Sequence, residues 1–324
     1  MAARLHPAPE PFREIVDLRR LSSRDLVPLL EEECLAWRGE LEWDFDKSAD
    51  LVRRFIDMGA LSGSALVEDG CVTGYMYYVL EEDKGLVGDL YVRRAVRTPE
   101  RENLLLGAAL EPMMESPLVR RIESQLMMLA YDPRRPIPYP EWLSVFERNF
   151  MRIDLTTALL RSGNVRRPMY VEKWNDHYHD GTAQLIAAAY AGHVDSRIND
   201  QYRSPTGARR FLHNIVQYPG CGAFYRPASV VAFEGVSGRI CGVSLASLVT
   251  PEAGHVTQIC VSPHVRGTGI GHELLRQSLL TLREMGCASA SLTVTAANTD
   301  AVALYERVGF QTIRRFSAFV WEGF

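Results

Sequence analysis

A short glycine-rich segment carries residue types that could bind a diphosphate. Residues 265–271 read Val-Arg-Gly-Thr-Gly-Ile-Gly, follow an apolar run at residues 255–261 and precede a long amphipathic helical pattern. The first N–H groups of a helix have no partner within it, and that end of the helix dipole is positive. Glycines allow phosphates to approach because no Cβ stands in the way. A pyrophosphate site is therefore predicted at the junction of this strand and helix.

The spacing of the glycines limits the classes of phosphate ligand that the segment could bind. A P-loop would need Lys and then Ser or Thr after its last glycine, and neither is present. A dinucleotide fingerprint would need a third glycine where His272 stands. What remains is Arg-x-x-Gly-x-Gly, beginning at Arg266. This spacing resembles the coenzyme A pyrophosphate loop of the GNAT acyltransferase superfamily.

A second motif lies farther along the chain. Asn298, Ala301, Tyr305, Gly309 and Phe310 follow a strand-like stretch at 289–295 and resemble the GNAT signature N-x-x-A-x-x-x-Y-x-x-x-G-F. Between the motifs, apolar residues recur at helical spacing and predict a helix with one buried face. These are Ile270, Leu274, Leu275, Leu279 and Leu282, with Gly286 placed to end the helix.

The resemblance implies acyl transfer from acetyl-CoA to an amine. In this family the strand at 255–261 splays from the strand at 289–295, and its backbone pairs with the pantetheine arm and directs an N–H at the thioester oxygen. Such a donor is worth roughly 10²–10³ in rate. Eleven residues are assigned by the resemblance to coenzyme binding: Ile259, Cys260, Val261, Arg266, Gly267, Thr268, Gly269, Ile270, Gly271, Asn298 and Tyr305.

Two residues are candidates for catalysis. The resemblance assigns Tyr305 as the acid that protonates the leaving thiolate; the alternative is a half-buried aromatic residue of the core. His255 stands where many family members carry Glu, and an imidazole can accept a proton at neutral pH. Strand alternation predicts that His255 shares a face with Thr257, Ile259 and Val261. A structural histidine, with water accepting the proton, is the alternative.

Other reactive side chains carry weaker predictions. Cys260 is expected to point away from His255 and to be a core thiol rather than a nucleophile. His177 and His179 lack a third ligand at metal-site spacing, so no metal is expected. The acceptor site is expected in the irregular segments 189–203 and 218–222. There, Asp195 and Asp200 either hold a cationic amine or are solvated, and no acceptor is named from them.

The two halves of the chain resemble each other. A shift of 169 positions places Val92 on Val261 and Arg97 on Arg266, and it places Leu105, Leu106 and Leu110 on three of the buried helix positions. A helix is expected around 142–148, and residues 146–150 are aligned with 305–310. The prediction is two tandem GNAT-like domains, residues 1–163 and 164–324. Each is an α/β (α+β) unit with a mixed, mostly antiparallel twisted sheet flanked by helices.

The first copy departs from the motif at the glycine loop. Under the same shift Thr268, Gly269 and Gly271 become Pro99, Glu100 and Glu102. Proline lacks an N–H, and the two carboxylates would repel a pyrophosphate. The first domain is therefore expected not to bind acyl-CoA, but to be structural or to form a wall of the substrate cleft.

Composition is consistent with a globular cytoplasmic protein. The net charge of −4 disfavours a general nucleic-acid surface, and no run of 18 apolar residues predicts a membrane span. Residues 1–14 do not read as a signal peptide. The cysteines are scattered and read as reduced thiols: Cys34, Cys71, Cys221, Cys241, Cys260 and Cys287.

The predicted function is N-acyltransfer from acetyl-CoA to the amine of a small molecule or peptide, in the C-terminal domain. A non-catalytic acyl-CoA sensor acting on a partner protein is the alternative, and an O-acyltransferase is a third interpretation. A monomer or a homodimer is expected.

Overall fold

The computed structural model describes residues 12–218 and 220–324 and divides into two compact units. The first unit comprises Met1–Leu35, Ala49–Leu143 and Val320–Phe324, and the second comprises Ala36–Ser48 and Ser144–Phe319. Residues 1–14 are the segment that is not predicted to be a signal peptide, and residues 1–11 of it lie outside the described part of the chain. No helix of the described chain has the length and apolar character needed to cross a bilayer.

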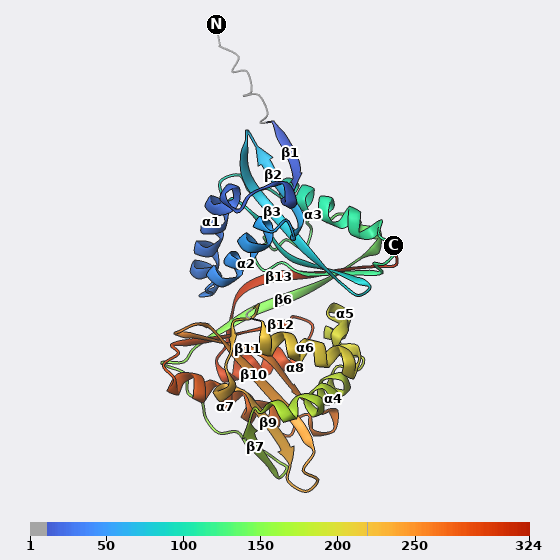
Figure 1. Ribbon diagram of the computed structural model, residues 1–324. Coiled ribbons are helices and arrows are strands. Elements are labelled where there is room, and N and C mark those ends of the chain that lie inside the picture. Colours follow the sequence, from blue (N-terminus) through green and yellow to red (C-terminus); the bar gives the residue numbers. More distant parts are fainter. Residues whose placement is uncertain (1–11, 219) are drawn as a thin grey trace. The chain divides into compact units, whose positions relative to one another are not determined.

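The first unit is a five-stranded sheet with helices (Figure 1), in the order β1-β2-β3-β4-β5. Its pairs are antiparallel except for β4 with β5, which is parallel. The hairpin between β2 and β3 turns at Asp69 and Gly70, both with positive φ. The elements are β1 (Arg13–Asp17), α1 (Ser23–Leu41), α2 (Asp46–Asp57), β2 (Ser62–Glu68), β3 (Cys71–Glu81), β4 (Lys84–Val92), α3 (Pro99–Met114) and β5 (Arg121–Gln125).

The second unit has the strand order β13-β6-β12-β11-β10-β9-β7, with β8 also pairing with β10. Within it β11 and β12 pair in parallel, whereas β10 pairs antiparallel with β9 and β11. The strands are β6 (Leu143–Asp154), β7 (Met169–Lys173), β8 (Ala223–Phe224), β9 (Val230–Glu234), β10 (Ile240–Thr250), β11 (Ala253–Val261), β12 (Ser289–Thr295) and β13 (Gln311–Glu322). The helices are α4 (His179–Ala189), α5 (Asp195–Ile198), α6 (Pro205–Gln217), α7 (Ile270–Glu284) and α8 (Thr299–Val308).

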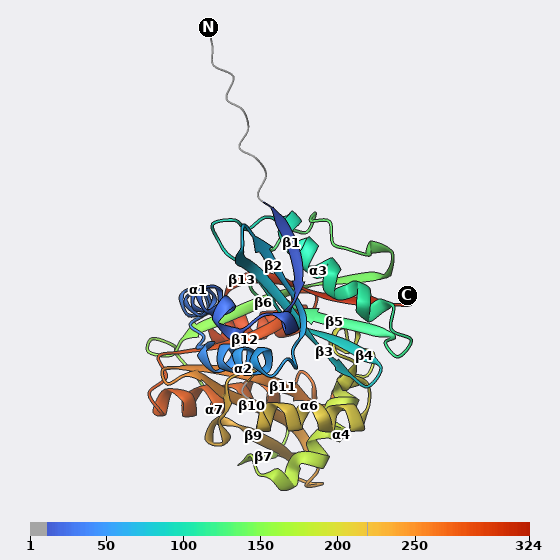
Figure 2. The ribbon, with the colours of Figure 1, turned by 45° about the horizontal axis from the view of Figure 1, so that its top comes forward.

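The core of the second unit lies on both faces of its sheet. Neighbouring residues Val231 and Ala232 of β9 join different clusters, because successive strand residues point to opposite faces. One cluster includes residues of α4 and α6, and the other includes residues of α7. Figure 2 labels these three helices beside strands β9 to β11. The five apolar positions predicted for α7 are each at most 1% exposed, and Gly286 has a φ of 94°. The strand–loop–helix prediction is confirmed.

The duplication is visible in the packing of small residues. A Cβ on Gly74 of β3 would lie 3.0 Å from both Leu105 and Val92. A Cβ on Gly242 of β10 would lie 2.7 Å from Leu274 and 3.2 Å from Val261, the partners of those residues under the 169-residue shift. The two units therefore use the same strand–helix contact.

Both units also contain the expected divergence of two parallel strands. Pairing of β11 with β12 ends at Val256 and Leu292, so the rest of β11 has no partner strand on that edge among the residues that the structure describes. In the first unit, pairing of β4 with β5 ends at Val87 and Ser124. The predicted splay of residues 255–261 from 289–295 is confirmed.

The helix expected around 142–148 is wrong. Trp142 ends a one-turn 3-10 helix and Leu143 begins β6, in which Arg148 to Asp154 pair antiparallel with Thr295 to Ser289 of β12. The alignment of 146–150 with 305–310 is therefore also wrong, because it matches a strand with the end of α8. Conversely, α2 was not predicted, although Ala49, Val52 and Ile56 have the helical spacing of a buried face.

The compact units do not follow the repeats in a simple way. Strand β6 precedes residue 164, where the second repeat is predicted to begin, but it belongs almost entirely to the second unit. The last five residues of the described chain, in contrast, belong to the first unit. The domain boundary between residues 163 and 164 reflects the repeat in sequence and stays a prediction.

Candidate active site

The glycine loop, residues 266–271, has the backbone that its sequence requires. Gly267 and Gly269 have φ of 73° and 90°, in the left-handed region that favours glycine. Gly269 is the N-cap of α7, and a Cβ there would lie 2.5 Å from the carbonyl oxygen of Asn164. A Cβ on Gly267 would meet nothing within 4 Å. Position 267 therefore favours glycine for its positive φ alone. Position 269 favours glycine both for its positive φ and because the Asn164 carbonyl leaves no room for a Cβ.

The start of α7 presents unclaimed backbone donors. Among the described residues, no acceptor is found for the N–H groups of Gly269, Ile270, Gly271 and His272. Glu273 is the first residue of α7 whose N–H makes the helical hydrogen bond to the residue four positions earlier, here the carbonyl of Gly269. Since unpaired N–H groups at a helix N-terminus attract anions, this end of α7 has the chemistry of a phosphate site.

Two side chains of the loop fix it to its surroundings. Arg266 donates through Nη2 to the carbonyl of Ala189, at the end of α4. The Thr268 hydroxyl donates to the carbonyl of Val265 at 2.6 Å, and the carbonyl of Thr268 accepts from Arg166 N–H at 2.9 Å. Both residues therefore shape the loop, in addition to the coenzyme contacts predicted for them.

The face assignment of β11 is wrong because the strand contains a bulge. Gln258 pairs with Leu245 and Val256 with Ala246, so Thr257 is an extra residue. One extra residue reverses the alternation. Val256 and Ile259 consequently pack on the α7 side, whereas Cys260 packs with the cluster of α4 and α6. His255 therefore shares a face with Gln258 and Cys260 rather than with Ile259 and Val261.

His255 lies in an aromatic environment. It is 5% exposed, its Nδ1 lies 2.9 Å from the Ser291 hydroxyl, and its ring centroid lies 5.0 Å from Trp43 and 6.1 Å from Phe150. Burial lowers its pKa to about 3, because the cationic form is desolvated. The imidazole is therefore neutral at pH 7 and a weak base, so these surroundings do not favour the predicted role as general base.

Tyr305 lies in α8, which follows β12 and the splay. It is 7% exposed, and burial, followed by the nearby Asp195 carboxylate, raises the pKa of its phenol above the ordinary value. The hydroxyl therefore stays protonated at neutral pH and is available as a donor. Asn298 is the N-cap of α8, and its side-chain oxygen accepts from Ala301 N–H at 3.4 Å.

The thiol of Cys260 is not activated. Burial raises its pKa to about 12, against a smaller opposing effect of Arg266. A thiolate is the nucleophilic form, so the expectation of a packed thiol agrees with this environment. In the described part of the chain no group of three or more metal-ligating side chains is close enough to hold a metal ion.

A polar cluster near Tyr305 was missed in the sequence. Arg148 Nη1 lies 3.2 Å from Asp195 Oδ1 and 2.9 Å from Thr295 Oγ1, and the Thr295 hydroxyl donates to Asp195. Asp195 was considered as a possible amine partner, but its residues 195–198 form a short helix rather than a loop. Arg148 was assigned to a helix, which concealed its position on β6 beside β12.

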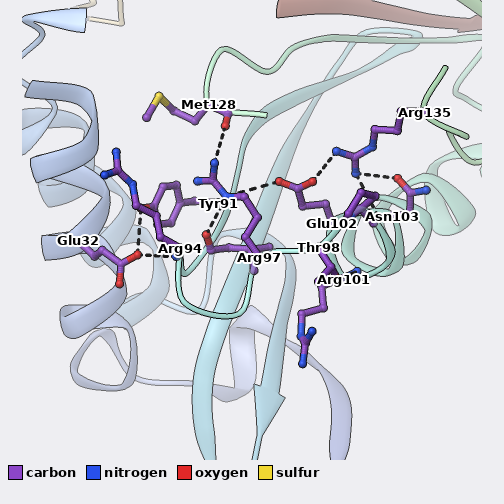
Figure 3. A network of polar contacts seen from close by, with 12 residues as sticks. Glu32, Tyr91, Arg94, Arg97, Thr98, Arg101, Glu102, Asn103, Met128 and Arg135 are labelled. Carbon is purple, nitrogen blue, oxygen red and sulfur yellow. Dashed lines mark hydrogen bonds and ion pairs between the residues drawn. The ribbon is translucent and has the colours of Figure 1, made fainter. Parts of the chain in front are cut away.

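The first unit closes the equivalent helix end with its own side chains (Figure 3). Glu102 is 2% exposed and forms ion pairs with Arg135 and, at 3.7 Å, with Arg97, the counterpart of Arg266. Thr98 caps α3 by accepting from Arg101 N–H at 3.3 Å. The first unit therefore has a buried carboxylate, that of Glu102, at the position that Gly271 takes in the second unit.

A cavity in the second unit lies away from the glycine loop. It has a volume of about 630 Å³ and is lined at the start of β11 and β12 by Ala253 and Ser289, with Glu42 and Arg152. Neither the glycine loop nor Tyr305 lines it. The cavity is therefore separate from the candidate site.

Comparisons with known proteins agree with this site. Residues 171–310 match the Acetyltransferase (GNAT) family. The layout inferred from the sequence is similar to that of mycothiol synthase. Mycothiol acetyltransferase of Propionibacterium freudenreichii subsp. shermanii is 25% identical over 142 residues, which are 43% of this chain and 43% of that protein. The [Ribosomal protein bS18]-alanine N-acetyltransferase of Escherichia coli K12 is 36% identical over 81 residues, 24% of this chain and 54% of that protein. The chain thus spans about half the length of these curated relatives.

Solved structures share the fold over nearly the whole chain. A GCN5-related N-acetyltransferase from Sphaerobacter thermophilus has a TM-score of 0.65 at 20% identity, covering 96% of this chain and 95% of that one. A tandem GNAT protein from the clavulanic acid biosynthesis pathway has a TM-score of 0.64 at 17% identity, covering 96% and 98%. Residues 171–310 therefore belong to the GNAT family of acetyltransferases, and the whole chain shares the fold of a tandem GNAT protein.

Proposed function

We propose that the second unit is an acetyl-CoA-dependent N-acetyltransferase that acts on the amine of a small molecule or peptide. The observation that carries this proposal is the row of four unclaimed N–H groups at the start of α7, on the helix that follows the splayed strand. The family match over residues 171–310 supports the reaction class. The named relatives are a mycothiol acetyltransferase and a ribosomal-protein acetyltransferase, so both kinds of acceptor occur among similar proteins.

The residues present fit the coenzyme. The N–H groups from Gly269 to His272 would take the pyrophosphate, and no side chain at Gly267 or Gly271 would stand against it. The partner-free edge of β11 from Thr257 to Val261 would pair with the amide-bearing pantetheine arm. A β-edge with unpaired backbone groups is suited to hydrogen-bonding an extended amide chain.

The coenzyme supplies an activated thioester. The amine nitrogen forms a bond to the acyl carbon, the carbon–sulfur bond breaks, and the nitrogen loses one proton. The Tyr305 hydroxyl donates a proton to the departing sulfur and recovers one from water, giving the amide and the free thiol. A positioned acid contributes roughly 10²–10⁴ in rate. Because burial lowers the pKa of His255 to about 3, we assign removal of the amine proton to water.

For the first unit we propose a structural role without coenzyme binding. Glu102 is buried at the start of α3 with Arg135 and Arg97, so an incoming pyrophosphate would meet a fixed carboxylate. Cys71, Cys221, Cys241, Cys260 and Cys287 have free thiols, which is consistent with a proposed cytoplasmic location.

Release of free thiol from acetyl-CoA, measured over amino acids, peptides, polyamines and aminoglycosides, tests the proposed function. Turnover with at least one amine, and a product heavier by one acetyl group, is expected. Calorimetric binding of acetyl-CoA without turnover of any amine would favour the sensor. A product acetylated on oxygen would instead identify an O-acyltransferase.

A further inference from the structure

The polar cluster of Arg148, Asp195 and Thr295 joins three elements of the second unit, β6, α5 and β12. Arg148 pairs with Thr295 at the last rung between β6 and β12, beyond the point where β12 loses its pairing with β11. The cluster therefore lies on the splayed part of the sheet. Arg148 and Asp195 remain 13% and 14% exposed, so the ion pair is largely but not fully buried.

The ion pair leaves an acceptor atom of Asp195 and two donor groups of Arg148 unused. Asp195 Oδ1 accepts from Arg148 and Thr295. Oδ2 lies 3.6 Å from His193 Nδ1, but that nitrogen already accepts from Asp195 N–H at 3.1 Å and cannot donate as well. Arg148 uses Nη1 only; among the described residues neither its buried Nε nor its Nη2 has a partner. Nε is buried, so Nη2 is the donor that we assign to a ligand.

The pair is also close to the candidate catalytic residue. The Asp195 carboxylate raises the pKa of the Tyr305 phenol, and the Arg148 guanidinium lowers it, because both charges lie near the ring. The carbonyl of Thr295 accepts from the N–H of Asn298, the N-cap of α8, at 2.9 Å, so the cluster adjoins the start of the helix that carries Tyr305.

We propose that Arg148 and Asp195 select an acceptor whose amine is next to a carbonyl or carboxylate oxygen, as in an α-amino acid or the first residue of a peptide. This inference rests on the proposed acetyl transfer. Asp195 Oδ2 takes an N–H of the amine, and Arg148 Nη2 donates to the neighbouring oxygen. An amine without that oxygen would leave the guanidinium donor unused. A phosphorylated acceptor would face the Asp195 carboxylate, which opposes it. The pair therefore matches a molecule that presents a donor and an acceptor side by side.

The test compares matched acceptors that differ only at the oxygen. For each of several side chains, kcat/KM is measured with the amino acid, its amide, a dipeptide beginning with it and the corresponding amine without the carbonyl carbon. The compounds that keep the oxygen should be favoured by roughly 10- to 100-fold, since a site that hydrogen-bonds a substrate group discriminates against its loss. Preference for the free acid would indicate an amino acid, and preference for the amide and dipeptide a peptide N-terminus. Equal values for all four would overturn the proposal.

Variants separate recognition from a purely structural role. Arg148→Met should remove the advantage of the oxygen-bearing acceptors over the simple amine, chiefly through KM, and Asp195→Asn should raise KM for every acceptor. Arg152→Met is the matched control, because Arg152 lies on the same strand and pairs with Glu42 outside the site. Arg148→Lys serves if Arg148→Met does not fold; it keeps the charge but loses the planar donor pair. An unchanged preference in a folded Arg148 variant contradicts the inference.

A binding readout makes the inference independent of turnover. The same acceptors are titrated calorimetrically into the protein saturated with coenzyme A. Selective binding that is lost in the Arg148 variant supports the recognition role even if no acetyl transfer is detected, a result that would contradict only the proposed function. Binding without preference for the oxygen-bearing compounds contradicts the recognition role.

Discussion

Gly85 of β4 and Gly254 of β11 occupy the same position in the two repeats. A Cβ on Gly85 would lie 2.4 Å from the sulfur of Met113, and one on Gly254 would lie 2.6 Å from Cδ1 of Leu282. Each glycine lets its helix approach its strand at a residue 28 positions farther along the chain. The repeats have therefore retained their strand–helix packing while diverging at the helix N-terminus, where Glu102 and Gly271 correspond.

Gly271→Glu should weaken binding of coenzyme A at least tenfold. A Cβ at this position meets only ordinary contacts, 3.7 Å from Val261 and 4.0 Å from Leu304, so the fold should tolerate the change. The introduced carboxylate would face the bound pyrophosphate. Gly269→Glu is a less clean test because of its φ of 90° and its contact with Asn164. Titration calorimetry measures the affinity, and Gly107→Glu on α3, where nothing lies within 4 Å, controls for net charge.

Tyr305→Phe should lower kcat by roughly 10²–10⁴ and leave the affinity for acetyl-CoA nearly intact. The aromatic ring keeps its packing with Phe310, 6.0 Å away, while the donor is lost. Since the pKa of the phenol is raised, the wild-type enzyme should show no loss of rate from ionisation of Tyr305 between pH 7 and about 10. Stopped-flow thiol release and calorimetry give the two quantities. Wild-type turnover in the variant would exclude Tyr305 from the mechanism.

His255 should make the protein less stable in acid. Its pKa falls from 6.5 to about 3 on folding, so the unfolded chain binds a proton that the folded chain does not. The contribution is complete above pH 6.5 and is lost as the pH falls towards 3, with a slope of up to about 1.4 kcal/mol per pH unit. Urea unfolding of wild type and His255→Gln between pH 7 and 4 should show a flatter profile for the variant.

His213→Gln, the same substitution at an exposed histidine, is the matched control. The kinetic role is tested by the same His255 variant. An acidic limb of the rate profile that disappears in His255→Gln would restore this histidine as the base.

Glu102→Ala should destabilise the first unit by about 3–5 kcal/mol, because Arg135, 4% exposed, would remain as a buried charge without its partner. Glu100→Ala is the control: Glu100 is 78% exposed, and its pair with Arg13 should contribute under about 1 kcal/mol. Hydrogen exchange of the first unit and urea unfolding measure both effects. The double variant Glu102→Ala/Arg135→Met should recover part of the loss; no recovery would indicate that the ion pair is not the cause.

Local sequence patterns predicted much of the secondary structure of the second unit. The pairing of strands that lie far apart in the sequence could not be predicted from such patterns. The glycine loop, α7, β12 and α8 follow from nearby residues, namely glycine positions, helical spacing and the Asn298 cap. Arg148 lies 147 positions from Thr295, its partner on β12, and its surroundings contain aromatic and charged residues that fit a helix as well as a strand. The extra residue Thr257 is set by the pairing of β10 with β11, which no periodicity within β11 reveals. The misassigned faces of His255 and Cys260 follow from it.

The most direct test of the account is a crystal structure of the protein with bound coenzyme A. We predict the pyrophosphate within hydrogen-bonding distance of the N–H groups of Gly269, Ile270 and Gly271, with the pantetheine arm along β11 towards Tyr305. A coenzyme anchored at the start of α3 beside Glu102, or at the cavity near Ser289, would contradict it.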